Sequence, residues 1–251
     1  MDDPGSSVRT TMDGPIATIT LSRPQALNAI TREMLVELAA TLDLISADEA
    51  VRVVVLTGEG RAFSAGVDLK ALGGRRLEDG AVGDLLDGPA REVIQRLTTI
   101  PQVIIARVNG ACFTGALELV LACDLAVAAS EAPMGDTHAK WGLRPSWGMS
   151  QRLSRAVGVT RARELSYTAR TFSGSEAADW GLAVRAVPLA DLDEAVTALA
   201  DAVLANSPGS LAAYKDLYRR ALDTVLVDGL TQEAATRYPI ADTEERIAAF
   251  R

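Results

Sequence analysis

The chain has 251 residues, of which 48% are hydrophobic and 23% charged, and it carries 33 acidic against 25 basic residues. This composition excludes a largely disordered chain, because enough apolar side chains are present to offset the entropy lost on folding. The formal charge of −8 argues against a nucleic-acid partner, since nucleic-acid-binding surfaces concentrate positive charge. A local anion site built from backbone N–H groups remains compatible with it.

The two cysteines and the single histidine limit which disulfide and metal sites the chain can form. Cys112 and Cys123 lie among apolar or small residues, which predicts reduced core thiols and a cytoplasmic protein. His138 is the only histidine, so a histidine-rich metal site is excluded and we predict no metal. The acidic start has no apolar targeting segment, and no apolar run reaches the ~20 residues that cross a bilayer, so no membrane association is expected.

Strand and helix patterns alternate through the first three quarters of the chain. Thr31 is expected to cap the first helix, because its hydroxyl can accept from an unpaired N–H group of the first turn. Residues 1–14 are interpreted as a loose arm and residues 73–88 as a mobile loop. In chain order, periodicity predicts strand 16–21, helix 32–45, strand 51–56, a helix ending near 97, strand 103–108, helix 115–123, strand 125–128, a structured loop 132–148, helices 149–158 and 160–168, and strand 183–187.

From Asp191 onward the pattern is helical to the last residue. The change in composition near residue 190 indicates a core over residues 1–190 and a helical appendage over residues 191–251. Within the core a strand–loop–helix unit recurs at intervals of roughly 50 residues, which indicates stacked turns of an α/β structure.

Two loops rich in small residues follow buried strands. One runs over 60–69 and the other over 109–118. Small residues let the backbone approach a ligand closely, and Gly115 is expected near a helix N-terminus, where N–H groups have no intrahelical partner. Two such groups converging from separate loops would form an oxyanion hole, in which one donor is worth about 3 kcal/mol. Packing alone explains either loop, but the repetition favours a site.

Short motifs recur in a specific order along nearly the whole chain, from about Pro15 to the C-terminal helices. They are SRP at 22–24 with LNA at 27–29, VVVLTG at 53–58, FSAGVDL at 63–69, NG at 109–110, Gly115, Glu118, CD at 123–124, Gly142, Pro145, QRL at 151–153, Ala177 and GLA at 181–183. In this order and spacing they resemble the crotonase superfamily, the enoyl-CoA hydratase/isomerase family.

The resemblance implies an α/β spiral of repeated ββα units with C-terminal helices that assemble a homotrimer or a hexamer. It also implies an acyl-CoA thioester as substrate, with coenzyme A as part of that substrate and no further cofactor. The backbone N–H groups of Val67 and Gly115 would hold the thioester oxygen. Lys215 is a weaker candidate for a phosphate contact across a subunit boundary, against the alternative of a solvated lysine. The residues that would line the CoA path are Ala26, Leu27, Ala65, Asp68 and Leu69.

Acid–base residues decide which reaction occurs. Hydratases of this family use two glutamates that flank a water molecule, and the first matches Glu118, which lies in an otherwise apolar stretch. Burial would raise the pKa of this carboxyl and suit it to proton transfer; the alternative is an inward structural carboxylate. The second position is held by His138, which can transfer protons near neutral pH. Asp136 is expected either to orient His138 or, if the loop is shifted, to act in its place.

These features favour an enoyl-CoA hydratase-like enzyme that adds water to a 2-enoyl-CoA, with Glu118 activating the water and His138 assisting the proton transfer. Because a family glutamate is replaced, two alternatives stay open. One is isomerase, hydrolase, decarboxylase or dehalogenase chemistry on the same scaffold, and the other is an acyl-CoA-binding protein without catalysis. Trp141, Pro145 and Trp147 are expected to shape the acyl pocket or to pack beneath it, with Arg144 as a surface cation nearby.

Overall fold

The computed structural model describes residues 6–70 and 79–250, and two β-sheets form the centre of this part of the chain. The strands are β1 (Val8–Asp13), β2 (Ile16–Leu21), β3 (Val53–Gly58), β4 (Ala62–Ser64), β5 (Val103–Val108), β6 (Ala111–Phe113), β7 (Leu125–Ala129), β8 (Met134–Gly135) and β9 (Arg185–Val187). The larger sheet has the order β1-β2-β3-β5-β7-β9, and the smaller has the order β4-β6-β8.

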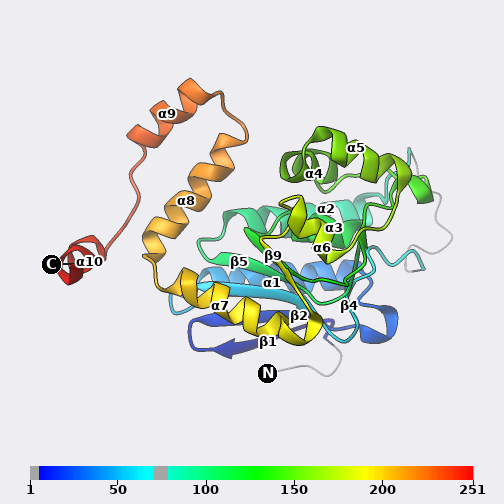
Figure 1. Ribbon diagram of the computed structural model, residues 1–251, viewed down its shortest axis with the longest axis horizontal. Coiled ribbons are helices and arrows are strands. Elements are labelled where there is room, and N and C mark those ends of the chain that lie inside the picture. Colours follow the sequence, from blue (N-terminus) through cyan, green and yellow to red (C-terminus); the bar gives the residue numbers. More distant parts are fainter. Residues whose placement is uncertain (1–5, 71–78, 251) are drawn as a thin grey trace.

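Helices of very different burial surround and extend these sheets (Figure 1). The α-helices are α1 (Arg32–Ser46), α2 (Asp84–Thr99), α3 (Gly115–Val120), α4 (Met149–Val157), α5 (Val159–Thr168), α6 (Gly174–Asp179), α7 (Leu192–Leu204), α8 (Pro208–Ala221), α9 (Leu226–Ala235) and α10 (Thr243–Phe250). Short 3-10 helices are η1 (Pro24–Ala26), η2 (Ala139–Trp141) and η3 (Leu189–Asp191). No helix among the described residues is long and apolar enough to cross a membrane.

A repeated unit generates both sheets at once. In β3-β4-α2 and again in β5-β6-α3, the first strand joins the large sheet, the second joins the small sheet, and a helix follows. β7 and β8 continue the pattern, and the named strands that follow the β1–β2 hairpin pair in parallel, with one isolated antiparallel bridge between Met134 and Phe172. Parallel strands covered on both faces are rich in apolar residues, as in β3, where all six residues are buried and the first four are Val or Leu. The repeats start at Val53, Val103 and Leu125, so the regular interval expected from the sequence is wrong for the third.

Several predicted elements are confirmed and others are corrected. Thr31 caps α1, where its Oγ1 accepts a hydrogen bond from the N–H of Met34 at 3.3 Å. The loose arm is wrong for residues 8–13, because β1 pairs with β2 along its whole length; a mostly polar edge strand lacks the apolar run by which strands are recognised. The predicted mobile loop falls partly on residues 71–78, outside the described residues, and α2 already begins at Asp84.

Short elements account for most of the remaining differences. β6 lies between β5 and α3, where a direct turn into a helix was expected, and α3 ends at Val120 instead of Cys123. α6 was not predicted, although Ser173 and Glu176 form a reciprocal capping box at its start. Elements of two to six residues carry too little periodicity to be recognised from one sequence.

The C-terminal helices differ in how closely they pack against the sheets. α7 packs against the large sheet through buried Leu192 and Val196, whereas α8, α9 and α10 extend away from the sheets as an arm (Figure 1). Lys215 ties α8 to the core: its Nζ donates to Asp124 Oδ2 at 2.8 Å and to the carbonyl of Gln102 at 2.9 Å. Lys215 is therefore neither solvated nor open to a phosphate within this chain. The boundary near residue 190 stays a prediction.

Candidate active site

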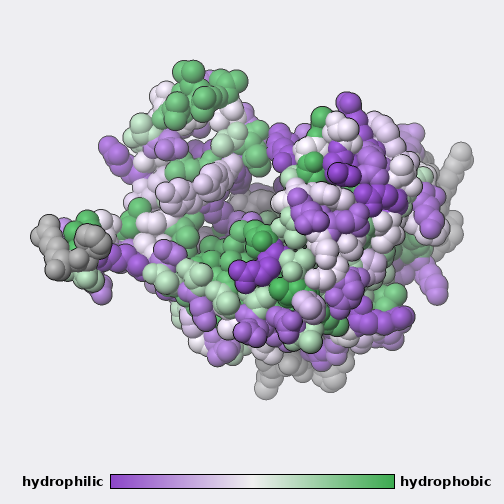
Figure 2. Space-filling model, in the orientation of Figure 1, coloured by the Kyte–Doolittle hydropathy of each residue, from purple (hydrophilic) through white to green (hydrophobic). Residues whose placement is uncertain are grey.

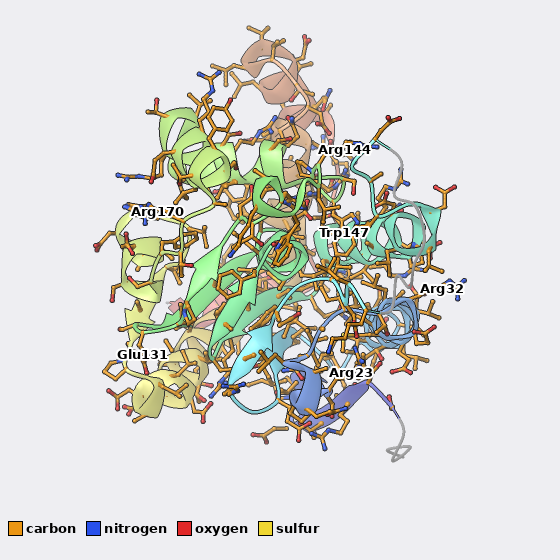
Figure 3. All side chains as sticks on the ribbon, turned by 90° about the vertical axis from the view of Figure 1, so that its right-hand side faces the viewer. Arg23, Arg32, Glu131, Arg144, Trp147 and Arg170 are labelled. Atoms are coloured by element: carbon orange, nitrogen blue, oxygen red, sulfur yellow. The ribbon has the colours of Figure 1, made fainter. Side chains whose placement is uncertain are left out.

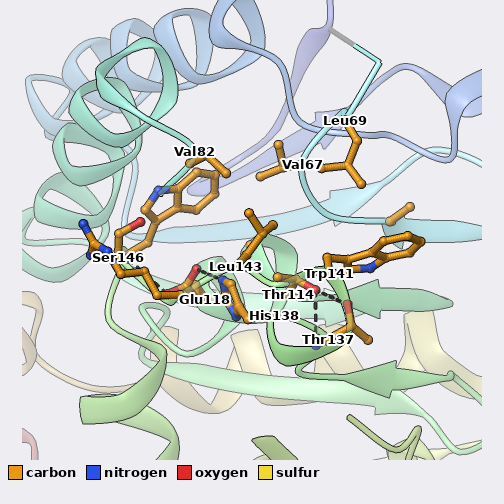
Figure 4. A pocket seen from close by; sticks show the side chains of 14 residues that line it. Val67, Leu69, Val82, Thr114, Glu118, Thr137, His138, Trp141, Leu143 and Ser146 are labelled. Atoms are coloured by element: carbon orange, nitrogen blue, oxygen red, sulfur yellow. Dashed lines mark hydrogen bonds and ion pairs between the residues drawn. The ribbon is translucent and has the colours of Figure 1, made fainter. Parts of the chain in front are cut away.

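A cavity of about 120 Å³ lies where the strands of the small sheet end. β4, β6 and β8 are parallel neighbours, so the loops that follow them leave from one edge, the edge at which parallel sheets bind ligands. Figure 4 shows Glu118 and His138 side by side, with Val67, Leu69 and Val82 across the cavity. The residues that line it are Ala65, Val67, Leu69, Val82, Thr114, Gly115, Glu118, Thr137, His138, Trp141, Leu143, Arg144, Ser146 and Trp147.

Val67 and Gly115, the two residues expected to supply backbone N–H donors, both line this cavity. Ile30 exchanges hydrogen bonds with the residues on either side of Val67, donating to the carbonyl of Gly66 and accepting from the N–H of Asp68. This pattern leaves the Val67 N–H directed away from Ile30. Gly115 is the first residue of α3, where N–H groups have no intrahelical acceptor. Within the described part of the chain, neither N–H group has a hydrogen-bond acceptor.

The two loops that carry these N–H groups touch each other, and the contact requires glycine. Gly66 has φ +90°, and a Cβ there would lie 2.7 Å from the carbonyl oxygen of Phe113. A Cβ on Gly115 would lie 2.6 Å from the indole ring of Trp147. Thr114, just before Gly115, has φ +54°, an unusual conformation for a β-branched residue and of the kind that clusters at functional sites.

Glu118 projects from α3 and is only 1% exposed. Its Oε1 accepts hydrogen bonds from the N–H groups of Trp147 at 3.1 Å and Met149 at 2.9 Å. Burial raises the pKa of this carboxyl to about 6, because removal from water disfavours the charged form more than His138 and the two N–H donors favour it. Oε2 is the oxygen that faces His138.

His138 lies between two carboxylates. Its Nδ1 is 2.7 Å from Asp136 Oδ1, and its Nε2 is 3.7 Å from Glu118 Oε2, too far for a direct hydrogen bond. The chain turns back here, since the His138 N–H also bonds to Asp136 Oδ1 at 3.2 Å. This turn allows residues two apart to face each other. Ser166, on α5, donates to Asp136 Oδ2 at 2.7 Å.

Asp136 is placed to orient His138 and not to replace it. Burial alone would raise the pKa of the Asp136 carboxyl, but hydrogen bonds from His138 and Ser166 outweigh that effect and hold its pKa below the ordinary value. An ionised Asp136 can accept a hydrogen bond from an Nδ1–H group, and Nε2 is the ring nitrogen that faces Glu118. Of the two expectations for Asp136, this geometry corresponds to the orienting one.

The residues predicted along the CoA path come from two adjacent turns. Ala65 and Leu69 line the cavity. Asp68 forms an ion pair with Arg23 at 3.0 Å. Ala26 ends η1, and the carbonyl of Leu27 accepts from the N–H of Ala65 at 2.9 Å, which joins the two turns. Their roles toward a ligand stay a prediction.

Sequence reasoning missed one buried carboxylate near the cavity. Asp87 on α2 is 6% exposed, and its Oδ1 accepts from Ser146 Oγ at 2.7 Å and Trp147 Nε1 at 2.9 Å. The available signal was an acidic residue on the apolar stripe that also carries Leu86 and Ala90. Ser166 gave no comparable signal, because serine is common on half-buried helix faces.

The two tryptophans that line the cavity differ in how exposed they are to solvent. Trp147 is 3% exposed and forms part of the cavity wall from within the core, whereas Trp141 is 56% exposed at the cavity rim. Arg144 is exposed, as expected, and also borders the cavity. Figure 3 shows Trp147 inside the molecule, close to α2, with Arg144 farther out.

Comparison with known proteins identifies the family. The chain matches the family described as Enoyl-CoA hydratase/isomerase over residues 11–250. It is 37% identical over 235 residues to "Probable enoyl-CoA hydratase 1, peroxisomal" of Arabidopsis thaliana, a match that covers 93% of this chain and 86% of that protein. The chain therefore belongs to the enoyl-CoA hydratase/isomerase family, as its motifs predict.

Solved structures agree with this assignment. The fold is similar to that of an enoyl-CoA hydratase from Bacillus anthracis, with a TM-score of 0.89 and 32% identity over 98% of this chain and 96% of that one. It is also similar to a Thermobifida fusca YX protein in complex with CoA, with a TM-score of 0.80 and 34% identity over 97% of this chain and 94% of that one. The predicted α/β crotonase-like fold is thereby confirmed, while trimer formation by the C-terminal helices stays a prediction.

Proposed function

We propose that this protein is an enoyl-CoA hydratase that adds water to a 2-enoyl-CoA thioester, with Glu118 and His138 as its catalytic residues. The observation that carries the proposal is the placement of a buried carboxylate and an imidazole on one wall of a cavity that is also lined by Val67 and Gly115, whose N–H groups have no acceptor among the described residues. Family membership supports an acyl-CoA substrate and a hydratase-type reaction. The role of His138 in a glutamate's place is specific to this proposal.

Binding would polarise the substrate before any proton moves. The N–H groups of Val67 and Gly115 would donate to the thioester oxygen, where negative charge gathers as the double bond is attacked. Donors fixed by the backbone lose no free energy in reorienting during the reaction, which makes such contacts one of the larger catalytic terms. Because these contacts come from the main chain, they suit an acidic protein that binds an anionic thioester.

Hydration would then use the two side chains in complementary roles. Glu118 accepts a proton from water as the water oxygen bonds to the β-carbon, and the π electrons move toward the α-carbon and the thioester oxygen. His138, protonated at Nε2, gives its proton to the α-carbon. One water is consumed, and transfer of the proton from Glu118 to His138 restores the starting state. At 3.7 Å, Oε2 and Nε2 can both bond to one water on the cavity side.

Asp136 and Ser166 would act through His138. An ionised Asp136 that accepts from Nδ1 holds the ring so that Nε2 faces the substrate, and it stabilises the imidazolium that donates the proton. Ser166 holds the second oxygen of Asp136. Both are positioning residues in this scheme.

Double-bond isomerisation is the second candidate, because the family itself covers hydratases and isomerases. Isomerisation moves a proton from one carbon to another and needs no held water, so one buried carboxylate is sufficient for it. Hydration is favoured here by the second proton-transfer group that faces Glu118. An acyl-CoA-binding protein without catalysis predicts thioester binding that survives loss of both groups.

The test is a panel of 2-enoyl-CoA thioesters with products resolved by mass. We expect loss of the absorbance of the conjugated thioester and products heavier by one water. Glu118→Gln and His138→Ala are expected to lower kcat/KM by about 100-fold or more, the usual contribution of general acid–base catalysis, with CoA affinity retained. Glu194→Gln makes the same chemical change at an exposed position on α7 and is expected to have no effect.

Different outcomes separate the alternatives. Products of unchanged mass would support isomerisation, and absence of turnover with any thioester despite intact CoA binding would overturn catalysis. Ser166→Ala should shift the pH profile of kcat/KM without changing CoA affinity, whereas Ser166→Thr, which keeps the hydroxyl, should resemble the wild type.

We further propose that the protein works without a cofactor beyond the CoA of its substrate, as a homotrimer or hexamer, in the cytoplasm, and without membrane or nucleic-acid partners. The exposed apolar residues of the C-terminal arm support assembly. The Arabidopsis thaliana relative is named as peroxisomal, so cell fractionation is the test of location.

A further inference from the structure

Asp87 is a buried carboxylate that the proposed reaction does not use. Its carboxylate forms no ion pair among the described residues, and its Oδ1 accepts from Ser146 Oγ and Trp147 Nε1. Burial of a carboxylate without a cation is costly. An apolar residue on the buried stripe of α2 would avoid this cost, so the presence of a carboxylate there points to a specific task.

That task centres on the Trp147 side chain. The indole Nε1 is 2.9 Å from Asp87 Oδ1, and the six-membered ring packs against Gly115, where a Cβ would lie 2.6 Å from it. The main-chain N–H of the same residue donates to Glu118. The ring thus lies next to a proposed oxyanion donor, and its N–H group is hydrogen-bonded to Asp87.

The cavity beside this ring is small. Its volume of about 120 Å³ lies well below the ~300–1,000 Å³ of pockets that enclose drug-sized ligands. Val82, Leu143 and Trp147 supply apolar wall, and Ser146, which also borders the cavity, is held by the same Asp87 oxygen. Rotation of an unrestrained indole would change the space available to an acyl chain.

We propose that Asp87 is a positioning residue that sets acyl-length specificity: it locks Trp147 as a wall of the acyl pocket and thereby restricts the enzyme to short 2-enoyl-CoA thioesters. The inference rests on the proposed hydratase function and adds its substrate class. If the inference is correct, removing either partner of the Asp87–Trp147 hydrogen bond should allow the enzyme to accept longer acyl chains.

The experiment compares kcat/KM for crotonyl-CoA, 2-hexenoyl-CoA and 2-octenoyl-CoA. Wild type should lose about tenfold or more at each step, since methylenes that do not fit cost at least that much in discrimination. Asp87→Leu removes the acceptor at similar size, and Trp147→Phe removes the donor while keeping the main-chain N–H that serves Glu118. Each should raise the octenoyl-to-crotonyl ratio by about tenfold.

Two further variants control the comparison. Asp87→Asn keeps an oxygen that can accept from the indole and should retain the wild-type preference. Asp84→Asn removes a charge from an exposed position on the same helix and should leave both the rates and the ratio unchanged. Wild-type ratios in folded Asp87→Leu and Trp147→Phe would overturn the inference, as would a wild type that prefers octenoyl-CoA.

A binding series separates this inference from the proposed function. Butyryl-CoA and octanoyl-CoA are not substrates for hydration, and their affinities can be measured by calorimetry in the same variants. If the wild type hydrates no thioester, the proposed function fails. A preference for butyryl-CoA that disappears in both Asp87→Leu and Trp147→Phe would still support the pocket wall, and an unchanged preference would overturn it.

Discussion

Glu118 and His138 illustrate how a single residue depends on its immediate partners. Glu118 is buried beside apolar neighbours, yet two main-chain N–H groups and one imidazole face it. His138 has a carboxylate on each side, one close enough for a hydrogen bond and one not. The closer one, Asp136, is the hydrogen-bond partner of Nδ1, and the farther one, Glu118, is the partner of His138 in the proposed reaction.

The activity of the enzyme should depend on the ionisation of Glu118. Burial raises the pKa of this carboxyl to about 6, and a group that accepts a proton from water must be ionised. We therefore expect kcat/KM of the wild type to be highest above pH 6 and to fall as the pH drops below that value. A pH–rate profile with crotonyl-CoA measures this, and a flat profile between pH 5 and pH 7 would contradict a base of this pKa.

Ionisation of Glu118 should also change the stability of the protein, but it should lower stability where it raises activity. The folded state binds the Glu118 proton more tightly than the unfolded state, whose carboxyl has an ordinary pKa of 4.5. The free energy of unfolding therefore falls as the pH rises from 4.5 to about 6 and is lower by roughly 2 kcal/mol above that window. Glu118→Gln, which can still accept both N–H groups, should be more stable than wild type by roughly 1–2 kcal/mol at pH 7.

Urea unfolding of wild type and Glu118→Gln at pH 7 and at pH 4 tests this linkage. The difference in the free energy of unfolding should disappear at pH 4, because the wild-type carboxyl is then protonated in both states. A Gln variant that is less stable than wild type at pH 7 would show that the ionised carboxylate stabilises the fold.

At the scale of elements, parallel pairing brings the site together. β4, β6 and β8 contain only two or three residues each, but their parallel order places three following loops at one edge. The loops then contact each other at Gly66 and Phe113. Away from the site, an ion pair between Lys215 on α8 and Asp124 ties α8 to the core.

Removal of that anchor should destabilise the chain. Lys215 is 8% exposed at its side chain, and burial raises the pKa of Asp124 while Lys215 opposes the rise. Lys215→Met keeps the apolar stem but leaves Asp124 without its cation, so we expect a loss of about 2 kcal/mol in the free energy of unfolding, below the full cost of breaking a fully buried pair. Urea unfolding at pH 7 measures it.

The matched control is an exposed ion pair on the same helix. Arg220 pairs with Asp216 at the surface of α8, and such pairs contribute little, so Arg220→Ala should unfold like wild type. Equal stability of Lys215→Met and Arg220→Ala would contradict the anchoring role of Lys215.

At the scale of the whole molecule, the C-terminal arm carries many of the exposed apolar side chains found among the described residues. α8 and α9 stand away from the sheets (Figure 1), and Figure 2 shows hydrophobic residues gathered over α9. Leu226, Val227 and Leu230 are 57–77% exposed. Apolar surface of this kind is typical of protein–protein contacts, and symmetric self-assembly is the commonest outcome.

Light scattering should therefore give three or six times the 26.5 kDa chain mass. A double variant, Leu226→Glu with Leu230→Glu, should shift the protein toward the monomer, because it places charges in an apolar interface. Asp228→Asn, an exposed polar change on the same helix, should leave the mass unchanged. A monomeric wild type would contradict assembly through this arm.

Long patterned segments were predictable, and short or polar ones were not. The helix capped by Thr31 and the strands over 103–108 and 16–21 follow from periodicity that extends over several residues. β1 was missed because its exposed face is polar, and β6 and β8 because they are too short to show a pattern. In the site, Glu118 was recognisable as a carboxylate in an apolar stretch, whereas Asp87 and Ser166 acquire their partners only through the fold.

The sequence by itself determined the family and the α/β class and made Glu118 and His138 the candidate catalytic residues, because motifs and periodicity are properties of neighbouring residues. Only the tertiary structure decided that Asp136 faces His138, that Lys215 is engaged by Asp124, and that Asp87 holds Trp147. These are contacts between elements distant in the chain, or within a turn whose direction depends on its surroundings. Their geometry follows from packing, and packing decides which polar groups are buried together.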